Sequence, residues 1–247
     1  MAIEFVLLVL GAYLLGSVPA AYLVAKWSRG IDIRQYGSGN VGATNLLAVV
    51  SKKWGIPVIV FDLIKGMVAI YVAQWIGLGI MQQVTIGLAA IVGHNWPVFL
   101  RFSGGRGALT TLGVVLILAP KLALVLLAIA MIFSIFRQLA LGTILVIASL
   151  PVFSWFSSEP AIGWLFGQSF GTSEQLPATL SFLAIFLVAV IRRLTVPRAE
   201  IAVSVGTGQL LVNRLLFDRD IRDRDCLLYT SDAADELDGV DLGGRRI

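Results

Sequence analysis

Two stretches of the sequence combine glycine with a basic residue, a pattern suited to binding phosphate. The first, DIRQYGSGNVGATN, spans residues 32–45. Its glycines allow positive φ and a close approach of the backbone to a ligand, and successive N–H groups in such a turn can bind an anion. Arg34 adds a guanidinium that can contact phosphate through two nitrogens. A plain flexible loop is the alternative. The candidate donors beside Arg34 are Ser38, Gly39, Asn40, Thr44 and Asn45.

The second stretch, GHNWPVFLRFSGGRG, spans residues 93–107. Its last four residues directly precede a predicted helix, whose free N–H groups would face an anion. These candidate phosphate-binding residues are Gly104, Gly105, Arg106 and Gly107. His94 is the single histidine of the chain. It could act as a general base, because an imidazole titrates near neutral pH, or it could be a structural residue.

Two further motifs place polar residues inside apolar segments. In FDLIKG, residues 61–66, Asp62 and Lys65 are three positions apart and so share one face of a helix. Lys65 could bind an anionic substrate while Asp62 holds it, or the two could form a self-neutralising structural pair. In GSVP, residues 16–19, Pro19 interrupts a helix and frees backbone groups. Ser17 could satisfy one of those groups or take part in catalysis.

The segments that carry these motifs predict an all-α, polytopic integral membrane protein. Hydrophobic residues make up 57% of the chain and charged residues 14%, against about 25% charged in soluble domains. A membrane helix needs roughly 20 apolar residues, and several segments reach that length. An unusually apolar soluble domain is the rejected alternative. The seven predicted helices span residues 3–26, 56–79, 83–93, 107–119, 121–136, 139–156 and 178–192.

The basic residues predict the orientation of these helices. Lysine and arginine gather in every second loop, and such loops face the cytoplasm in membrane proteins. With seven helices, this pattern places the N-terminus outside, the C-terminus in the cytoplasm and the glycine-rich stretches on the cytoplasmic side. The basic residues of these loops are Arg29, Arg34, Lys52, Lys53, Arg101, Arg106, Arg137, Arg192, Arg193 and Arg198.

The remaining sequence excludes several classes of site. A single cysteine, Cys226, and a single histidine leave no intramolecular disulfide and no Cys/His metal site, so we expect no metal and no cofactor. No GxxxxGK[ST] motif occurs, which argues against a nucleotide P-loop. Residues 226–247 resemble a translated sequencing adapter and are expected to be disordered. The predicted division is a membrane domain at 1–198, a cytoplasmic extension of unknown role at 199–225, and this tail.

Phosphate-binding elements beside apolar helices indicate a reaction that joins a phosphorylated polar molecule to an acyl chain at a membrane surface. The four motifs, in the order GSVP, DIRQYGSGNVGATN, FDLIKG and GHNWPVFLRFSGGRG, resemble the bacterial acyl-phosphate:glycerol-3-phosphate acyltransferases (PlsY type). The resemblance implies a seven-helix enzyme of the bacterial inner membrane, with its active site facing the cytoplasm. It would move a fatty acyl group from acyl phosphate to glycerol 3-phosphate, giving lysophosphatidic acid without a cofactor or nucleic acid.

The same resemblance implies roles for particular residues and also reveals departures. Ser17 and Arg34 match positions tied to activity in the family, and the glycines around Arg106 match its glycerol 3-phosphate loop. The family usually has lysine at position 106 and serine at position 140, where this chain has Arg106 and Ala140. Its last motif, RHxxNIxRL, is replaced by IRRLTVPRAEI, with Arg193 and Val196 nearest the missing histidine and asparagine.

Because of these departures, two other functions stay open. One is a catalytically silent homologue that binds a phosphorylated lipid precursor. The other is a transporter for an organophosphate anion, which would need charged loops reachable from both faces of the membrane. The predicted outside loops carry almost no matching donors, and this disfavours the transporter.

Overall fold

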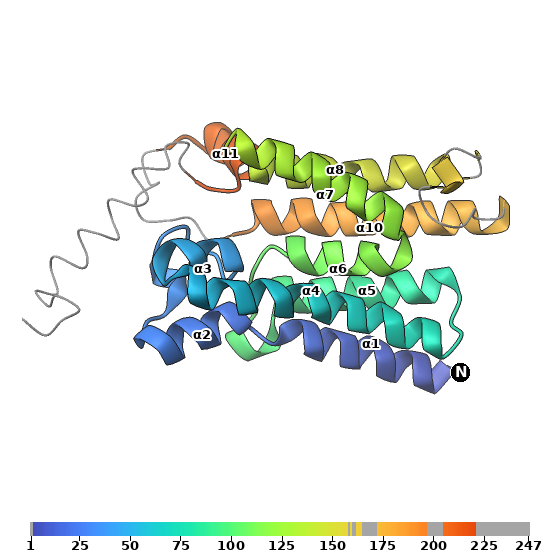
Figure 1. The fold of residues 1–247 in the computed structure, drawn as a ribbon, viewed down its shortest axis with the longest axis horizontal. Coiled ribbons are helices and arrows are strands. Elements are labelled where there is room, and N and C mark those ends of the chain that lie inside the picture. The colour runs from blue at the N-terminus through green and yellow to red at the C-terminus, as the bar shows by residue number, and fades with distance from the viewer. Residues whose placement is uncertain (1, 158, 160–161, 165–171, 197–204, 221–247) are drawn as a thin grey trace, which may run out of the picture.

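A computed structural model describes residues 2–157, 159, 162–164, 172–196 and 205–220, and every regular element in this part of the chain is helical. The long helices lie lengthwise beside one another as a bundle (Figure 1). The helices are α1 (Ala2–Ser17), α2 (Ala20–Arg29), α3 (Ala43–Val49), α4 (Lys52–Trp75), α5 (Ile80–Asn95), α6 (Ala108–Leu118), α7 (Pro120–Ile135), α8 (Leu139–Trp155), α10 (Thr172–Leu194) and α11 (Thr207–Phe217). Two short 3-10 turns, η1 (Ile33–Gln35) and η2 (Val98–Leu100), lie in the loops.

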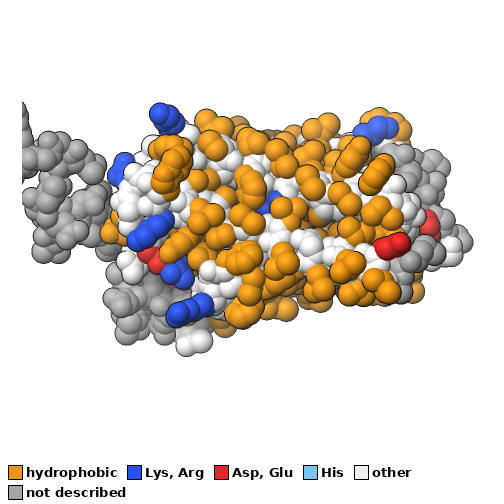
Figure 2. All heavy atoms as spheres, turned by 90° about the horizontal axis from the view of Figure 1, so that it is seen from below, with side chains coloured by type: hydrophobic (Ala, Val, Ile, Leu, Met, Phe, Trp, Pro, Cys, Tyr) orange, Lys and Arg blue, Asp and Glu red, His pale blue; other side chains and the backbone are white. Residues whose placement is uncertain are grey.

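The predicted all-α membrane protein is confirmed by this architecture. Within the described part of the chain, three stretches are long and apolar enough to cross a membrane: Ile3–Arg29, Lys52–Trp75 and Ser173–Leu194. Three shorter apolar helices are α6, α7 and α8. Hydrophobic side chains cover the middle of the face in Figure 2, and most lysines and arginines on it gather at the end of the bundle that carries α2 and α3. An apolar middle with charged ends is the surface expected of a protein embedded in a bilayer.

The first predicted segment is broken, as its GSVP motif indicated. α1 ends at Ser17 and α2 begins at Ala20. In an unbroken helix the carbonyl of Gly16 would accept the N–H of Ala20, but that N–H donates to the carbonyl of Val18 instead. The freed carbonyl of Gly16 accepts a hydrogen bond from Nζ of Lys65 at 3.2 Å. The break therefore links α1 to the charged residues of α4.

Glycines let the backbones of α1 and α5 touch directly. A Cβ added to Gly16 would collide with the carbonyl oxygen of Ala90, and one added to Gly93 would collide with that of Tyr13. The contact is reciprocal, because each helix offers one glycine to the backbone of the other. Close approach through small residues is a typical way for membrane helices to associate. α4 and α6 have the same arrangement, with Gly66 against Thr110 and Gly113 against Leu63.

Replacement of Gly93 with alanine is expected to lower thermal stability strongly. The added methyl group would meet backbone of α1, which cannot rotate away, and overpacking of this kind costs about 1–3 kcal/mol. Gly11→Ala is the matched control, since Gly11 lies in α1 with nothing within 4 Å of an added Cβ. Thermal unfolding of the two variants in detergent makes the comparison. Equal melting temperatures would contradict direct backbone contact between α1 and α5.

The loops that carry the candidate residues gather at one end of the bundle. The loop between α2 and α4, the loop between α5 and α6, and the helix α11 all lie at the end opposite the N-terminus (Figure 1). α11 contacts α8 and α10 and belongs to the segment expected as a cytoplasmic extension. The tail predicted to be disordered, residues 226–247, lies outside the described residues.

Candidate functional site

Three charged or ionisable side chains meet in the bundle interior between α4 and α5. Nζ of Lys65 lies 2.7 Å from Oδ1 of Asp62 and 2.7 Å from Nδ1 of His94. Oδ1 of Asp62 is also 3.6 Å from Nδ1 of His94. All three residues are buried. Ionisable side chains in the interior of a membrane helix bundle are costly unless they pair with one another. The side chains of Asp62, Lys65 and His94 are paired in this way.

The contact with Lys65 determines what His94 can do. A charged Lys65 can only donate hydrogen bonds, so beside its ammonium Nδ1 of His94 is the acceptor and the ring proton is on Nε2. An added Cβ on Gly105 would collide with that nitrogen, so Nε2 lies directly against the GGRG loop. In this tautomer His94 offers an N–H donor toward the loop. The arrangement thus favours a hydrogen-bond donor over the general base suggested by the sequence.

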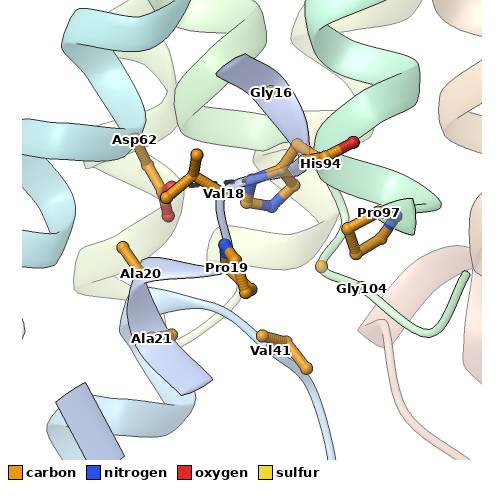
Figure 3. Close-up of a pocket in the computed structure, with 12 residues that line it drawn as sticks. Gly16, Val18, Pro19, Ala20, Ala21, Val41, Asp62, His94, Pro97 and Gly104 are labelled. Atoms are coloured by element: carbon orange, nitrogen blue, oxygen red, sulfur yellow. Dashed lines mark ion pairs between the residues drawn. The ribbon is translucent and has the colours of Figure 1, made fainter. Parts of the chain in front are cut away.

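A small cavity of about 10 Å³ adjoins this cluster where α1 breaks. Figure 3 shows Asp62 and His94 beside it, with Pro19 of the break and Gly104 of the GGRG loop among the lining residues. Ser17 also lines it and is fully buried. Its hydroxyl has no hydrogen-bond partner among the described residues, so it does not satisfy a backbone group freed by Pro19.

A larger cavity of about 280 Å³ opens on the other side of Asp62 and His94, which line both spaces. Its size is close to the lower limit for ligand pockets, roughly 300 Å³. It lies between the two glycine-rich loops, the start of α8 and the end of α11. Besides Asp62 and His94, its lining includes Ser38, Asn40, Thr44, Asn45, Arg106, Gly107, Arg137, Ala140, Thr143, Phe217 and Asp218.

Asn45 fixes the shape of the first glycine-rich loop. Its side-chain amide donates to the carbonyls of Tyr36 and Asn40, at 3.0 and 3.1 Å, and its oxygen accepts from the N–H of Ser38 at 3.0 Å. Gly37 and Gly39 both have positive φ, which lets the loop turn tightly around this amide. Asn45 was predicted to contact substrate, but its donors are used by the loop itself.

The second glycine-rich loop is held from the other side by α10. Arg192 donates from Nε to the carbonyl of Gly105 at 2.8 Å and from Nη2 to that of Gly104 at 2.7 Å. The N–H of Gly105 donates to the carbonyl of His94 at 3.0 Å. Gly107 has a φ of 71° and precedes α6, so Arg106 is presented at a helix N-terminus. This is the place where the sequence predicted an anion to bind.

Arg34 lies at the same end of the bundle but does not line either cavity. Its guanidinium pairs with Asp32, with Nη2 2.6 Å from Oδ2. The hydrogen bond from Arg34 holds the pKa of Asp32 below its ordinary value, and the pKa of Arg34 is raised in return. Arg34 is therefore not part of the wall that Arg106 contributes to the larger cavity. Lys65 points into the cluster with Asp62 and His94.

Sequence reasoning missed several residues at the site, among them two arginines, an aspartate and an asparagine. Arg192 holds the GGRG loop, and Arg193 donates to the carbonyl of Ala140 and the hydroxyl of Thr143. Asp218 follows α11, and its Oδ1 lies 2.9 Å from Nε of Arg106. Asn95 is fully buried, and its side-chain amide has no partner among the described residues. The sequence signal for the two arginines was read as a cytoplasmic anchor only.

Comparison with known proteins places this chain among membrane acyltransferases. The family model described as glycerol-3-phosphate acyltransferase matches residues 6–205. Glycerol-3-phosphate acyltransferase 4 of Dehalococcoides mccartyi (strain CBDB1) is 44% identical over 230 residues, which cover 93% of this chain and 95% of the relative. Glycerol-3-phosphate acyltransferase 5 of the same species (strain ATCC BAA-2266) is 43% identical over 236 residues, 96% of this chain and 97% of the relative.

Solved structures give the same result. The crystal structure of PlsY (YgiH), an integral membrane glycerol 3-phosphate acyltransferase, in its glycerol 3-phosphate form has a TM-score of 0.69 and 30% sequence identity. The match covers 89% of this chain and 96% of that one. The lysophosphatidic acid form of PlsY has a TM-score of 0.66 and covers 92% of this chain and 99% of that one. The chain belongs to the glycerol-3-phosphate acyltransferase family.

Proposed function

We propose that this protein transfers a fatty acyl group from acyl phosphate to glycerol 3-phosphate, giving lysophosphatidic acid and inorganic phosphate. Family membership supports the acceptor and the product, because the similar PlsY structures are a glycerol 3-phosphate form and a lysophosphatidic acid form. The resemblance of the four motifs to the acyl-phosphate-dependent enzymes supports the donor. The protein would act in phospholipid biosynthesis.

The observation that carries the proposal is the larger cavity. Arg106 lines it at the N-terminus of α6, and His94 and Asp62 lie at its inner wall. A phosphate group in this cavity would meet a guanidinium and the free N–H groups of a helix start, which together favour an anion. The cavity therefore combines a phosphate-binding side with buried polar groups able to act on a neighbouring hydroxyl or carbonyl.

The chemistry asks little of the protein beyond positioning and charge stabilisation. Acyl phosphate is an activated mixed anhydride. A hydroxyl oxygen of glycerol 3-phosphate attacks its carbonyl carbon, the bond from that carbon to the phosphate oxygen breaks, and the hydroxyl proton leaves with a phosphate group. Holding the reactants together can supply a large part of the rate enhancement. In the proposed mechanism the N–H of His94 donates to oxygen on which negative charge develops.

We place the reaction at the cytoplasmic face of a bacterial inner membrane. The described basic loops lie at one end of the bundle (Figure 1), and residues of these loops line the larger cavity. Positively charged loops face the cytoplasm in membrane proteins. Seven crossings with the N-terminus outside fit the helices α1/α2, α4, α5, α6, α7, α8 and α10. The apolar exterior of these helices would keep acyl chains beside the site.

The test is an assay of purified protein with a long-chain acyl phosphate and glycerol 3-phosphate. We expect lysophosphatidic acid and phosphate to form in equal amounts. Product formation from an acyl thioester in place of acyl phosphate would overturn the proposed donor. Binding of glycerol 3-phosphate without product would indicate the silent homologue, and uptake of glycerol 3-phosphate into proteoliposomes without product would indicate the transporter.

A further inference from the structure

The end of α11 brings a carboxylate to the wall of the larger cavity. Asp218 follows the last residue of α11 and lines the cavity together with Phe217. Its backbone has a φ of 61°, a conformation that is uncommon outside glycine but is adopted most readily by asparagine and aspartate. This segment lies beyond residue 205, where the family match ends.

The turn that presents Asp218 is firmly held. Arg214 pairs with the Asp220 carboxylate through Nε at 2.6 Å and Nη2 at 3.2 Å. Its Nη1 also donates to the carbonyl of Leu194, at 3.0 Å, and so fastens α11 to the end of α10. The side-chain amide of Asn213 donates to the carbonyl of Asp220 at 3.0 Å. Because these bonds lie on both sides of residue 218, its carboxylate occupies a defined position.

The Asp218 carboxylate contacts two arginines from different elements. Its Oδ1 lies 2.9 Å from Nε of Arg106 and 3.5 Å from Nε of Arg193. These contacts are ion pairs, because neither Oδ1 of Asp218 nor Nε of Arg106 has a hydrogen-bond partner among the described residues. The terminal nitrogens of Arg193 are already engaged by the carbonyls of Leu215 and Ala140 and by the hydroxyl of Thr143. For Arg106 the contact is at Nε, and its terminal nitrogens have no hydrogen-bond partner among the described residues. A guanidinium held at Nε still presents its Nη groups to a ligand.

We propose that Asp218 is a positioning residue that holds Arg106 in the orientation needed to bind the phosphate of glycerol 3-phosphate. An unheld arginine has many rotamers, and ordering it on substrate binding weakens affinity. The inference rests on the proposed function of the larger cavity. It adds the residue that follows the C-terminal helix to a site whose other walls are the two glycine-rich loops, Asp62, His94 and the start of α8.

Two relatives show that the helix carrying Asp218 is part of a longer shared segment. The two alignments cover 230 and 236 residues of this chain, which has 247. An alignment of that length includes Thr207–Phe217 whichever residue of the chain it starts at. Both relatives have names of the same activity as the rest of the family. The sequence similarity to these glycerol-3-phosphate acyltransferases of Dehalococcoides mccartyi therefore extends over the residues of α11 and Asp218.

The test is steady-state kinetics of Asp218→Asn, which keeps the shape of the side chain and tolerates positive φ. We expect KM for glycerol 3-phosphate to rise about three- to tenfold, with kcat within about twofold of the wild type. Asp218→Gly should give the same result, because glycine accepts the left-handed turn without strain. This second variant therefore distinguishes loss of the carboxylate from loss of the fold. Glu174→Gln, an exposed carboxylate at the opposite end of the bundle, should leave KM unchanged.

A double-mutant cycle with Arg106→Ala identifies the partner. If Asp218 acts through Arg106, Asp218→Asn should have little further effect on KM once Arg106 is alanine. An unchanged KM in the single variants, or an equal rise in the Arg106→Ala background, would overturn the inference. A fall in KM would overturn it as well, since it would mean that the carboxylate competes with the phosphate. A wild-type protein without activity would instead refute the proposed function.

Discussion

Replacing Asp62 with asparagine is expected to destabilise the protein by about 3–5 kcal/mol, the usual cost of removing one partner from a buried ion pair. Lys65 would keep its ammonium in the bundle interior, with Nζ 3.2 Å from the carbonyl of Gly16 and 2.7 Å from Nδ1 of His94. Neither group carries a negative charge. Lys65→Met is expected to have an effect of similar size, because it leaves the carboxylate of Asp62 buried without its cation.

The double variant Asp62→Asn/Lys65→Met is the control for this prediction. It removes both charges, so it should unfold at a higher temperature than either single variant while remaining inactive, since His94 has lost the ammonium that defines its tautomer. Thermal unfolding in detergent, together with the acyl-phosphate assay, provides both measurements. Single variants that melt with the wild type, or a double variant less stable than both, would show that the charges are not paired.

Replacing Arg106 with alanine is expected to weaken the use of glycerol 3-phosphate about ten- to a hundredfold. The reason is the loss of a hydrogen bond to a charged group, commonly about 1.5–3 kcal/mol. Arg106→Lys should cost far less, because the cation remains at the start of α6. The measurement is kcat/KM for glycerol 3-phosphate at saturating acyl phosphate.

Arg101→Ala is the matched control for Arg106. Arg101 belongs to the same loop and is exposed, and it lines neither cavity. If both arginines are only cytoplasmic anchors, their alanine variants should behave alike and keep the normal dependence on glycerol 3-phosphate. An Arg106→Ala variant with unchanged kcat/KM would refute phosphate binding by this arginine.

The long apolar helices were predictable from the sequence because each depends on a local property, whereas the short helices α3 and α11 were not predicted. Long apolar segments predict membrane helices wherever they occur, and the observed bounds differ from the predicted ones by a few residues. The break of the first segment was predictable for the same reason, since Pro19 has no N–H to continue a helix. α5 spans Ile80–Asn95 and so extends beyond the predicted residues 83–93 at both ends. The added residues include Gln82, His94 and Asn95, which a search for apolar residues leaves out.

The buried cluster was predictable in part. Asp62 and Lys65 share one helix, so their spacing alone brings them together. His94 joins them only because α5 packs against α4, and no local pattern contains that information. The tautomer of His94 follows from the same packing.

The partners of the arginines could not be predicted from the sequence. Arg34 had a nearby acid in Asp32, yet the glycine-rich loop around it suggested a free guanidinium. Arg106 finds Asp218 more than a hundred residues away, through a helix whose sequence shows no motif of its own. Choosing between such partners requires the positions of α10 and α11, which depend on packing of the whole bundle.

The reciprocal glycines of α1 and α5 limit how this enzyme can evolve. Gly16 directly precedes Ser17, and Gly93 directly precedes His94, so each helix carries its point of contact next to a candidate functional group. Inserting one residue between the two would turn the functional group by about 100° around its helix. We therefore expect the lipid-facing residues of α1 to vary freely between related sequences. Gly16 and Ser17 should stay adjacent, and so should Gly93 and His94.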